Sequence, residues 1–111
     1  AGEVCGFALA QDLATPPYDC VIPYRYAYLM DLCVDERHRN GGVGALLMES
    51  VKSWARGRGL RYVELCALAQ NEGAVRFYRR EGFLIQGRQT DRETGETELI
   101  LCWEQRRNAV P

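Results

Sequence analysis

The sequence predicts a single α/β domain built on one mixed sheet, with a parallel strand–helix–strand unit at its centre and antiparallel strands beside it. The 111 residues are enough for one domain with a modest core. Short apolar or β-branched segments alternate with two segments of helical period. A helix that joins two strands of one sheet makes those strands parallel. We therefore expect residues 1–111 to form one unit without repeats.

The first part of the chain predicts two strands. Residues 3–11 (EVCGFALAQ) are a short apolar run between polar residues, which favours a strand. Two adjacent prolines then predict a loop over residues 12–19. Residues 24–35 are rich in aromatic and aliphatic side chains and predict the second strand. The polar, glycine-containing residues 35–42 predict a loop.

A helix should follow this loop, because the apolar period changes from two to between three and four. Gly59 provides a residue that tolerates the left-handed conformation at the end of the helix. The apolar stripe is expected to comprise Val43, Leu46, Leu47, Val51, Trp54 and Ala55.

The remaining part of the chain predicts a strand, a helix and a hairpin. Residues 60–68 (LRYVELCAL) are apolar and β-branched. Asn71 is a suitable N-cap for a helix that ends at Gly82. Residues 83–87 and 98–103 predict two antiparallel strands, joined by the turn segment DRETG.

Composition excludes several classes of protein. A formal net charge of −1 gives no basis for a nucleic-acid or membrane partner. No apolar run approaches the roughly 18 residues of a membrane span. The five cysteines are scattered and no secretory signal precedes them, so we expect reduced thiols and a cytoplasmic location. His38 is the single histidine and has no ligand spacing around it, so we expect no metal site.

Three glycines between a strand and a helix predict an anion site. Gly41, Gly42 and Gly44 let a ligand approach the backbone without a Cβ in the way. The first N–H groups of the helix have no partner within it, and the helix dipole favours negative charge there. Pyrophosphate is an anion that fits such a place, with Arg37 and Arg39 nearby.

Three other kinds of loop share part of this glycine pattern. Adjacent glycines also occur in a plain turn into a helix. A P-loop is excluded, because Ala45 and Leu46 stand where its Lys and Ser or Thr belong. A dinucleotide fingerprint fails because Leu47 replaces its third glycine, and Glu64 lies inside a predicted strand.

Two motifs resemble the GNAT superfamily of N-acetyltransferases. The segment RNGGVG, residues 39–44, is similar to the family's pyrophosphate signature, Q/R-x-x-G-x-G/A. Residues 71–83 (NEGAVRFYRREGF) resemble the family's N-x-x-A-x-x-F-Y-x-x-x-G-F block. The two occur in the family's order with a strand between them, and the resemblance runs from about residue 3 to residue 103.

The resemblance implies an acetyl-CoA site. Backbone amides of the glycine loop would hold the pyrophosphate, and the end of the preceding strand would hydrogen-bond the pantetheine arm. Arg76, Arg79 and Arg80 could reach the 3′-phosphate, although a solvated helix face is an alternative. The implied cofactor-binding residues are Leu32, Cys33, Val34, Arg39, Asn40, Gly41, Gly42, Val43, Gly44, Ala45 and Asn71.

Tyr78 is the residue that the resemblance places at the sulfur of the cofactor, where it would donate a proton to the departing thiolate. A thiol has a pKa of roughly 8.5 and tyrosine about 10, so full transfer is uphill by roughly 2 kcal/mol. We therefore expect Tyr78 to stabilise the thiolate through a hydrogen bond, with proton transfer late or partial. The alternative is a tyrosine that only packs in the core.

The acceptor end departs from the family pattern. An amine of pKa about 10.4 is only about one part in 2,500 neutral at pH 7, which costs near 4.6 kcal/mol, so a base or water chain must act. Glu64 and Asp31 are the candidates, but the usual acid positions carry Cys66 and Met30. Glu64 is the predicted base, with a purely structural acid as the alternative. Cys66 has no histidine to activate it as a nucleophile.

The resulting prediction is an N-acetyltransferase that uses acetyl-CoA as co-substrate and a small-molecule or peptide amine as acceptor. An acetyl-CoA-binding module without turnover is the alternative. Tyrosines could line the acceptor pocket or pack within the strands: Tyr18, Tyr24, Tyr26 and Tyr28. Relatives carry a strand and helices before the segment that begins here, so we also expect an N-terminally incomplete domain that self-associates through an open strand edge.

Overall fold

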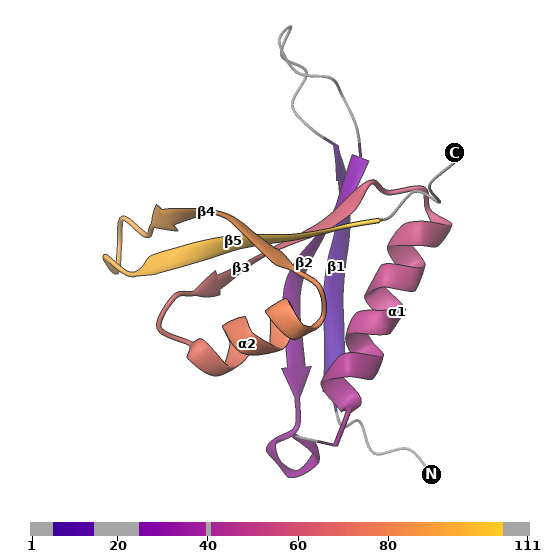
Figure 1. Ribbon diagram of the computed structural model, residues 1–111, viewed down its shortest axis with the longest axis horizontal. Helices are drawn as coiled ribbons and strands as arrows, with labels where there is room; N and C mark the ends of the chain where they lie inside the picture. Colours follow the sequence, from indigo (N-terminus) through magenta and orange to yellow (C-terminus); the bar gives the residue numbers. More distant parts are fainter. Residues whose placement is uncertain (1–5, 15–24, 40, 106–111) are drawn as a thin grey trace, which may run out of the picture.

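The computed structural model describes residues 6–14, 25–39 and 41–105, which form one sheet and two helices with a short 3-10 turn (Figure 1). In chain order the elements are β1 (Gly6–Ala14), β2 (Arg25–Val34), η1 (Glu36–His38), α1 (Val43–Gly57), β3 (Tyr62–Leu68), α2 (Glu72–Arg80), β4 (Leu84–Thr90) and β5 (Thr97–Glu104). This order confirms the predicted α/β architecture.

The sheet has the strand order β1-β2-β3-β5-β4. The pair β2 and β3, joined by α1, is parallel, and every other pair is antiparallel, as predicted. The parallel pair is short: only Ala27 with Val63 and Tyr28 with Glu64 are partners. Beyond them the strands separate, and Figure 1 shows β2 and β3 running in different directions.

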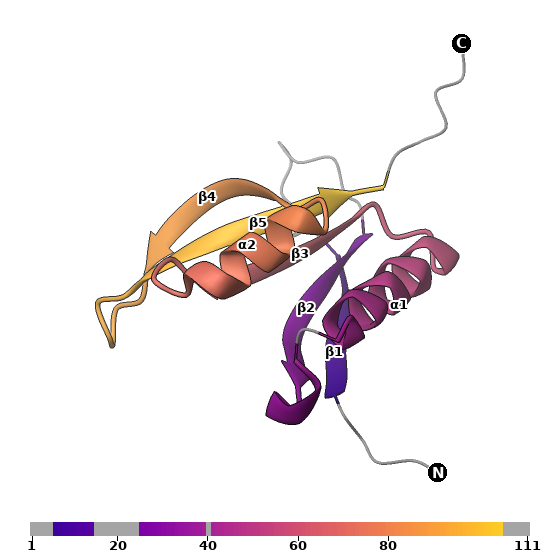
Figure 2. The same cartoon turned by 60° about the horizontal axis from the view of Figure 1, so that its bottom comes forward.

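The core lies on one face of the sheet. Alternate residues of the central strands are buried there, among them Ala27, Val63 and Leu101, each fully inaccessible. Met48, Val51 and Ala55 of α1 pack on these residues, and Val75, Phe77 and Tyr78 of α2 pack against the same cluster. Both helices therefore cover this face, which we call the helix face (Figure 2). The other face, the open face, carries no described helix.

The predicted apolar stripe of α1 was wrong at Leu46. This side chain is 70% exposed, whereas Met48 is fully buried. The buried positions at 48, 51 and 55 follow helical spacing and define the contact face. Leu46 lies outside that arc.

Lys52 of α1 is the one charged side chain that is buried among the described residues. Its Nζ donates to the carbonyl of Glu81 at 2.5 Å and lies 5.1 Å from the ring centre of Trp103. Glu81 is the C-cap of α2, so the ammonium stabilises the negative end of that helix. Lys52 therefore connects α1 to the C-terminal end of α2 on the helix face.

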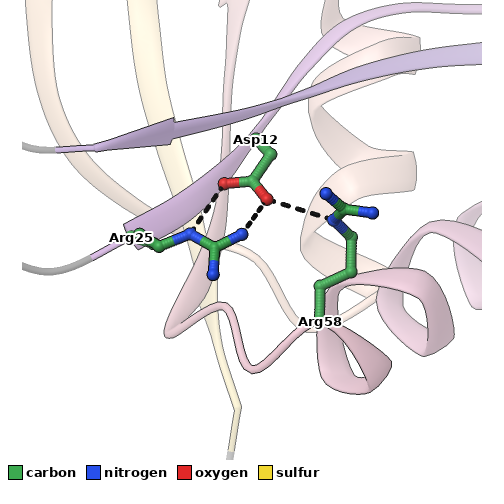
Figure 3. Close-up of polar contacts among 3 residues, drawn as sticks. All are labelled: Asp12, Arg25 and Arg58. Carbon is green, nitrogen blue, oxygen red and sulfur yellow. Dashed lines mark hydrogen bonds and ion pairs between the residues drawn. The ribbon is translucent and has the colours of Figure 1, made fainter.

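The strand β1 extends to Ala14, beyond the predicted end at residue 11, because Asp12 has partners on two elements. Its carboxylate accepts from Arg25 of β2 and from Nε of Arg58, 3.0 Å away at the end of α1 (Figure 3). These two guanidinium groups lower the pKa of Asp12. These contacts of Asp12 with Arg25 and Arg58, which we call the Asp12 clasp, hold β1 and β2 against the end of α1.

The predicted ends of the other elements hold within a few residues. Asn71 caps α2 through Oδ1, which accepts from the amide of Ala74 at 3.2 Å. Gly59 and Gly82 have positive φ angles of 70° and 95° after α1 and α2. β4 continues to Thr90, three residues past its predicted end, because it stays paired with β5.

Several predictions fall on residues outside the described part. They include the loop prolines, Tyr18, Tyr24, Cys5, Cys20 and Asn40. Within the described part, neither helix has the length and apolar content needed to cross a membrane.

Candidate active site

A cleft of about 790 Å³ opens on the helix face where β2 leaves β3. Its walls are the end of β2, the first turn of α1 and one side of α2. Predicted site residues that line it are Leu32, Cys33, Val34, Arg39, Gly42, Gly44, Ala45, Asn71 and Tyr78. Segments far apart in the sequence thus meet in one place.

The β2 wall is shaped by a bulge. Leu9 and Ala10 of β1 face Asp31 and Leu29, so Met30 is the extra residue in β2. A bulge of one residue reverses which side chains face the core. Consequently Leu29 and Leu32 both pack inward, three positions apart. The following residues, through Val34, form an edge that is not paired with β3.

The first turn of α1 forms the second wall, and its glycines have distinct roles. Gly42 is the N-cap with φ of 83°, and no side chain caps this end by a hydrogen bond. Gly44 lies against α2: a Cβ there would come 3.2 Å from Cζ of Phe77. Gly41 and Val43 belong to the same loop and turn but do not line the cleft.

Of the two predicted arginines, only Arg39 lines the cleft. Its Nε donates to the carbonyl of Val34 at 3.3 Å, which holds the loop against the end of β2. Arg37 instead donates to Asp35 from both its amide and its guanidinium. These bonds lower the pKa of Asp35 and direct the charge of Arg37 to that carboxylate.

Tyr78 forms the inner part of the α2 wall. Its ring contacts Phe77 and Phe83 edge-on. Burial raises the pKa of Tyr78 above 10, and the nearby Asp31 and Cys33 raise it further. The phenol therefore remains protonated and can donate a hydrogen bond across the neutral pH range.

Cys33 lies on the β2 wall as an exposed thiol. Its Sγ donates to Oδ1 of Asp31 at 3.2 Å. This hydrogen bond raises the pKa of Cys33, so the thiol form dominates at neutral pH. Cys33 therefore adds no charge to the residues that line the cleft.

Glu64, the predicted base, does not line the cleft. It lies on the open face, opposite Cys102 on β5 and beside Tyr28 on β2. Burial raises the pKa of Glu64 above 4.5, against the opposing effect of a hydrogen bond from the Cys102 thiol. Burial and the adjacent Glu64 carboxylate in turn raise the pKa of Cys102 to about 11.

Cys66 stands on the same face, two residues after Glu64. A hydrogen bond between the Tyr28 hydroxyl and Cys66 contributes most to a raised pKa of Tyr28. The open face therefore holds one connected group of Tyr28, Glu64, Cys66 and Cys102. Tyr78 lines the cleft on the helix face, beside the end of β2, whereas this group lies on the open face next to the last paired residues of β2 and β3.

The structure adds cleft residues that the sequence reasoning did not assign. They are Gly73, Ala74, Phe77 and Glu81, together with Arg80, which was weighed only as a phosphate contact. The FY pair of the second motif was the available signal for Phe77, whose contact with Gly44 needed the structure. A second cavity of about 900 Å³ lies among Arg56, Arg61, Leu84 and Trp103. It contains none of the predicted site residues, and no described group of side chains could hold a metal ion.

The model of the acetyltransferase (GNAT) family matches residues 1–83, so the chain belongs to this family. An uncharacterized N-acetyltransferase of Methanocaldococcus jannaschii is 39% identical over 57 residues, which are 51% of this chain and 25% of that protein. The match with the family agrees with both sequence motifs.

Solved structures show the same fold. Chaetomium thermophilum Naa20, in complex with a bisubstrate analogue, has a TM-score of 0.83 at 18% identity, covering 93% of this chain and 60% of that one. A Bacillus anthracis protein in complex with acetyl coenzyme A has a TM-score of 0.68 at 28% identity, covering 72% and 49%. The chain thus spans between a quarter and three fifths of the length of these relatives.

Proposed function

We propose that this chain is the acetyl-CoA-binding core of an N-acetyltransferase, which transfers the acetyl group to a primary amine of a small molecule or peptide. The observation that carries the proposal is the position of Tyr78 and Glu64 on opposite faces of the sheet, where β2 and β3 separate. A thioester lying in this gap would present its sulfur to one side and its carbonyl to the other.

The cleft accounts for the cofactor end. The uncapped first turn of α1, with Gly42 and Gly44, offers backbone N–H groups to the pyrophosphate. From Leu32 to Val34, the edge of β2 that is not paired with β3 offers backbone groups to the amides of pantetheine, as it would to an added strand. The related B. anthracis protein, in complex with acetyl coenzyme A, supports the choice of this cofactor.

In the proposed reaction, the acceptor amine approaches from the open face and the sulfur of the thioester lies near Tyr78 on the helix face. The neutral amine nitrogen attacks the thioester carbonyl carbon from the open face, and a tetrahedral intermediate forms. The C–S bond then breaks, and the electron pair leaves with sulfur as a thiolate. Tyr78 donates a hydrogen bond to this thiolate. Because the pKa of Tyr78 is raised, full proton transfer is less favourable than for an ordinary tyrosine.

Glu64 is the base that accepts the proton of the amine, directly or through water. Its raised pKa brings the carboxylate closer to the range in which a general base is efficient. Its place beside Tyr28 puts it at the closed end of the gap.

An acetyl-CoA-binding module without turnover is the second candidate. Glu64 lies outside the cleft and at neither of the family's usual acid positions, and this observation favours the second candidate. Both candidates require the cofactor to bind, so binding alone does not separate them.

Two measurements test the proposal. Acetyl-CoA should raise the melting temperature, and free thiol should be released from it only when a primary amine is added. Thermal protection without thiol release over a broad panel of amines would favour the binding module. No thermal protection at all would contradict both candidates.

A further inference from the structure

Lys52 is the single lysine of the chain, and its side chain is buried on α1 with 7% of the residue exposed. Moving an ammonium group out of water costs free energy unless polar or aromatic groups receive it. The carboxylate of Glu49 lies 4.0 Å from Nζ but is 67% exposed, and an ion pair of this kind contributes little. Other groups must therefore offset the cost of burying Lys52.

These groups are the C-terminal end of α2 and two aromatic side chains. Nζ donates to the carbonyl of Glu81, the C-cap of α2, at 2.5 Å. It also lies 5.8 Å from the ring centre of Phe83 and 5.1 Å from that of Trp103. An aromatic ring attracts a cation at these distances, and the carbonyl end of a helix attracts positive charge. The ammonium of Lys52 is therefore bound where α2 ends.

Tyr78 depends on the same groups for its position. The amide of Phe83 donates to the carbonyl of Tyr78 at 3.0 Å. The Phe83 ring, which is fully buried, contacts the Tyr78 ring edge-on with their centres 6.0 Å apart. Glu81 ends the helix that carries Tyr78, and its amide donates to the carbonyl of Phe77 at 3.0 Å. A shift of the Phe83 ring or of the Glu81 carbonyl would therefore move both the backbone and the ring of Tyr78.

We propose that Lys52 is a positioning residue for Tyr78: from α1, its ammonium fixes the end of α2 and the Phe83 ring, and thereby the place of the phenol in the cleft. Lys52 does not line the cleft, and about 15 Å of helix separates it from Gly42 at the start of α1. It therefore acts through Tyr78 and not on the cofactor. The kinetic consequence rests on the function proposed above, whereas the placement of the ring does not.

The placement of the ring is tested by NMR of the chain with ¹³C-labelled tyrosine rings, without substrate. The Tyr78 signal is identified by its absence from Tyr78→Phe. Lys52→Met keeps a straight side chain of similar length and removes the charge, and it should move the Tyr78 signal. Glu49→Gln is the matched control, because it removes only the exposed partner of Lys52, and it should leave the Tyr78 signal in place.

The kinetic consequence is tested by thiol release from acetyl-CoA. Lys52→Met should lower kcat by about tenfold, because a small displacement of a group at the reacting atoms slows the reaction. The Kd for acetyl-CoA should change by less than about twofold, since the first turn of α1 and the edge of β2 are unaltered. In the Tyr78→Phe background, Lys52→Met should change kcat by less than about twofold, because no phenol remains to be displaced. Glu49→Gln should keep the kcat of the unmodified chain.

The outcomes separate the two proposals. An unmoved Tyr78 signal, or an equal loss of kcat from Lys52→Met with and without the Tyr78 hydroxyl, would overturn the positioning role and leave the acetyltransferase intact. If no amine releases thiol, the proposed function fails, and a displaced Tyr78 signal would still support the role of Lys52. Should Lys52→Met not fold, Lys52→Gln keeps a neutral donor for the Glu81 carbonyl and should give the same signal shift and the same dependence on Tyr78, with a smaller loss of kcat.

Discussion

Tyr28 on β2 and Glu64 on β3 are partners at the point where the two parallel strands separate. The gap that begins there has Tyr78 on the helix face and the Tyr28–Glu64 pair on the open face. An acyl donor can therefore enter from one side of the sheet and an acceptor from the other.

Tyr78→Phe should lower kcat for thiol release by roughly 10²-fold, because removing one donor to a developing anion has about this effect. The Kd for acetyl-CoA should change little, since the ring remains. Steady-state kinetics and calorimetric titration measure the two quantities. Tyr62→Phe, which keeps the ring stacked on Tyr26 away from the cleft, is the control and should retain activity. Equal losses in both variants would remove the specific role of Tyr78.

The pH profile should contain a limb due to Glu64. Because burial raises its pKa, kcat at saturating acceptor should fall with decreasing pH at values above the ordinary 4.5. Glu64→Gln should abolish this limb and lower kcat by roughly 10²-fold, whereas Glu104→Gln should retain it.

A raised folded-state pKa also means that ionised Glu64 destabilises the fold at neutral pH. Glu64→Gln should therefore melt no earlier than the unmodified chain, and a large drop in melting temperature would attribute the kinetic loss to unfolding.

Gly44→Ala should lower the free energy of unfolding by about 1–3 kcal/mol, because the new Cβ would press on the Phe77 ring. Phe77→Leu should partly relieve this cost, so the two substitutions should be non-additive in urea unfolding. Gly57→Ala is the matched control: nothing lies within 4 Å of its Cβ position, and alanine should stabilise the helix. Additive effects of the two substitutions would show that the ring is not the obstacle.

The Asp12 clasp should stabilise the fold in a pH-dependent way. Its folded-state pKa is lowered below 3.8, so the stabilisation is fully present above that value and disappears as pH falls through the lowered pKa. The melting temperature of Asp12→Asn should therefore be lower than that of the unmodified chain at pH 6, and the gap should close in acid and shrink in high salt. A gap that widens in acid would contradict the clasp.

Self-association should involve β1, an edge of the sheet with Phe7 49% and Leu9 51% exposed. Light scattering at micromolar concentration should report a species larger than a monomer, and Leu9→Lys should shift it toward monomer. Leu46→Lys, at an exposed position on α1, should leave the species unchanged. A monomer in the unmodified chain would count against the prediction.

Local signals were enough to predict the order of the elements and the nature of the sheet. Glycine, the N-cap residue and the change of period mark the described helices and turns within a few residues, as Asn71 and Gly82 show. The residue-level errors came from tertiary partners. Asp12 stays in β1 because Arg25 and Arg58 bind it, and Leu46 is exposed because the arc of α1 is set by the sheet.

Site residues, too, could be predicted where a contiguous motif contains them and not where strand pairing brings them together. The RNGGVG and N-x-x-A motifs indicated most of the cleft, since each is a contiguous segment whose backbone or helix spacing defines its role. The network on the open face could not be predicted, because Gln89, Glu98 and Cys66 come together only through strand register. The bulge at Met30 likewise depends on pairing with β1.

We propose that acetyl-CoA binds in the cleft between β2, α1 and α2. Two-dimensional amide NMR during titration with acetyl-CoA tests it most directly. The largest shifts should occur at the first turn of α1 from Val43 to Ala45, at Cys33 and Val34, and at Asn71. Shifts confined to the second cavity, around Arg61, Leu84 and Trp103, or no shifts at millimolar acetyl-CoA, would contradict it.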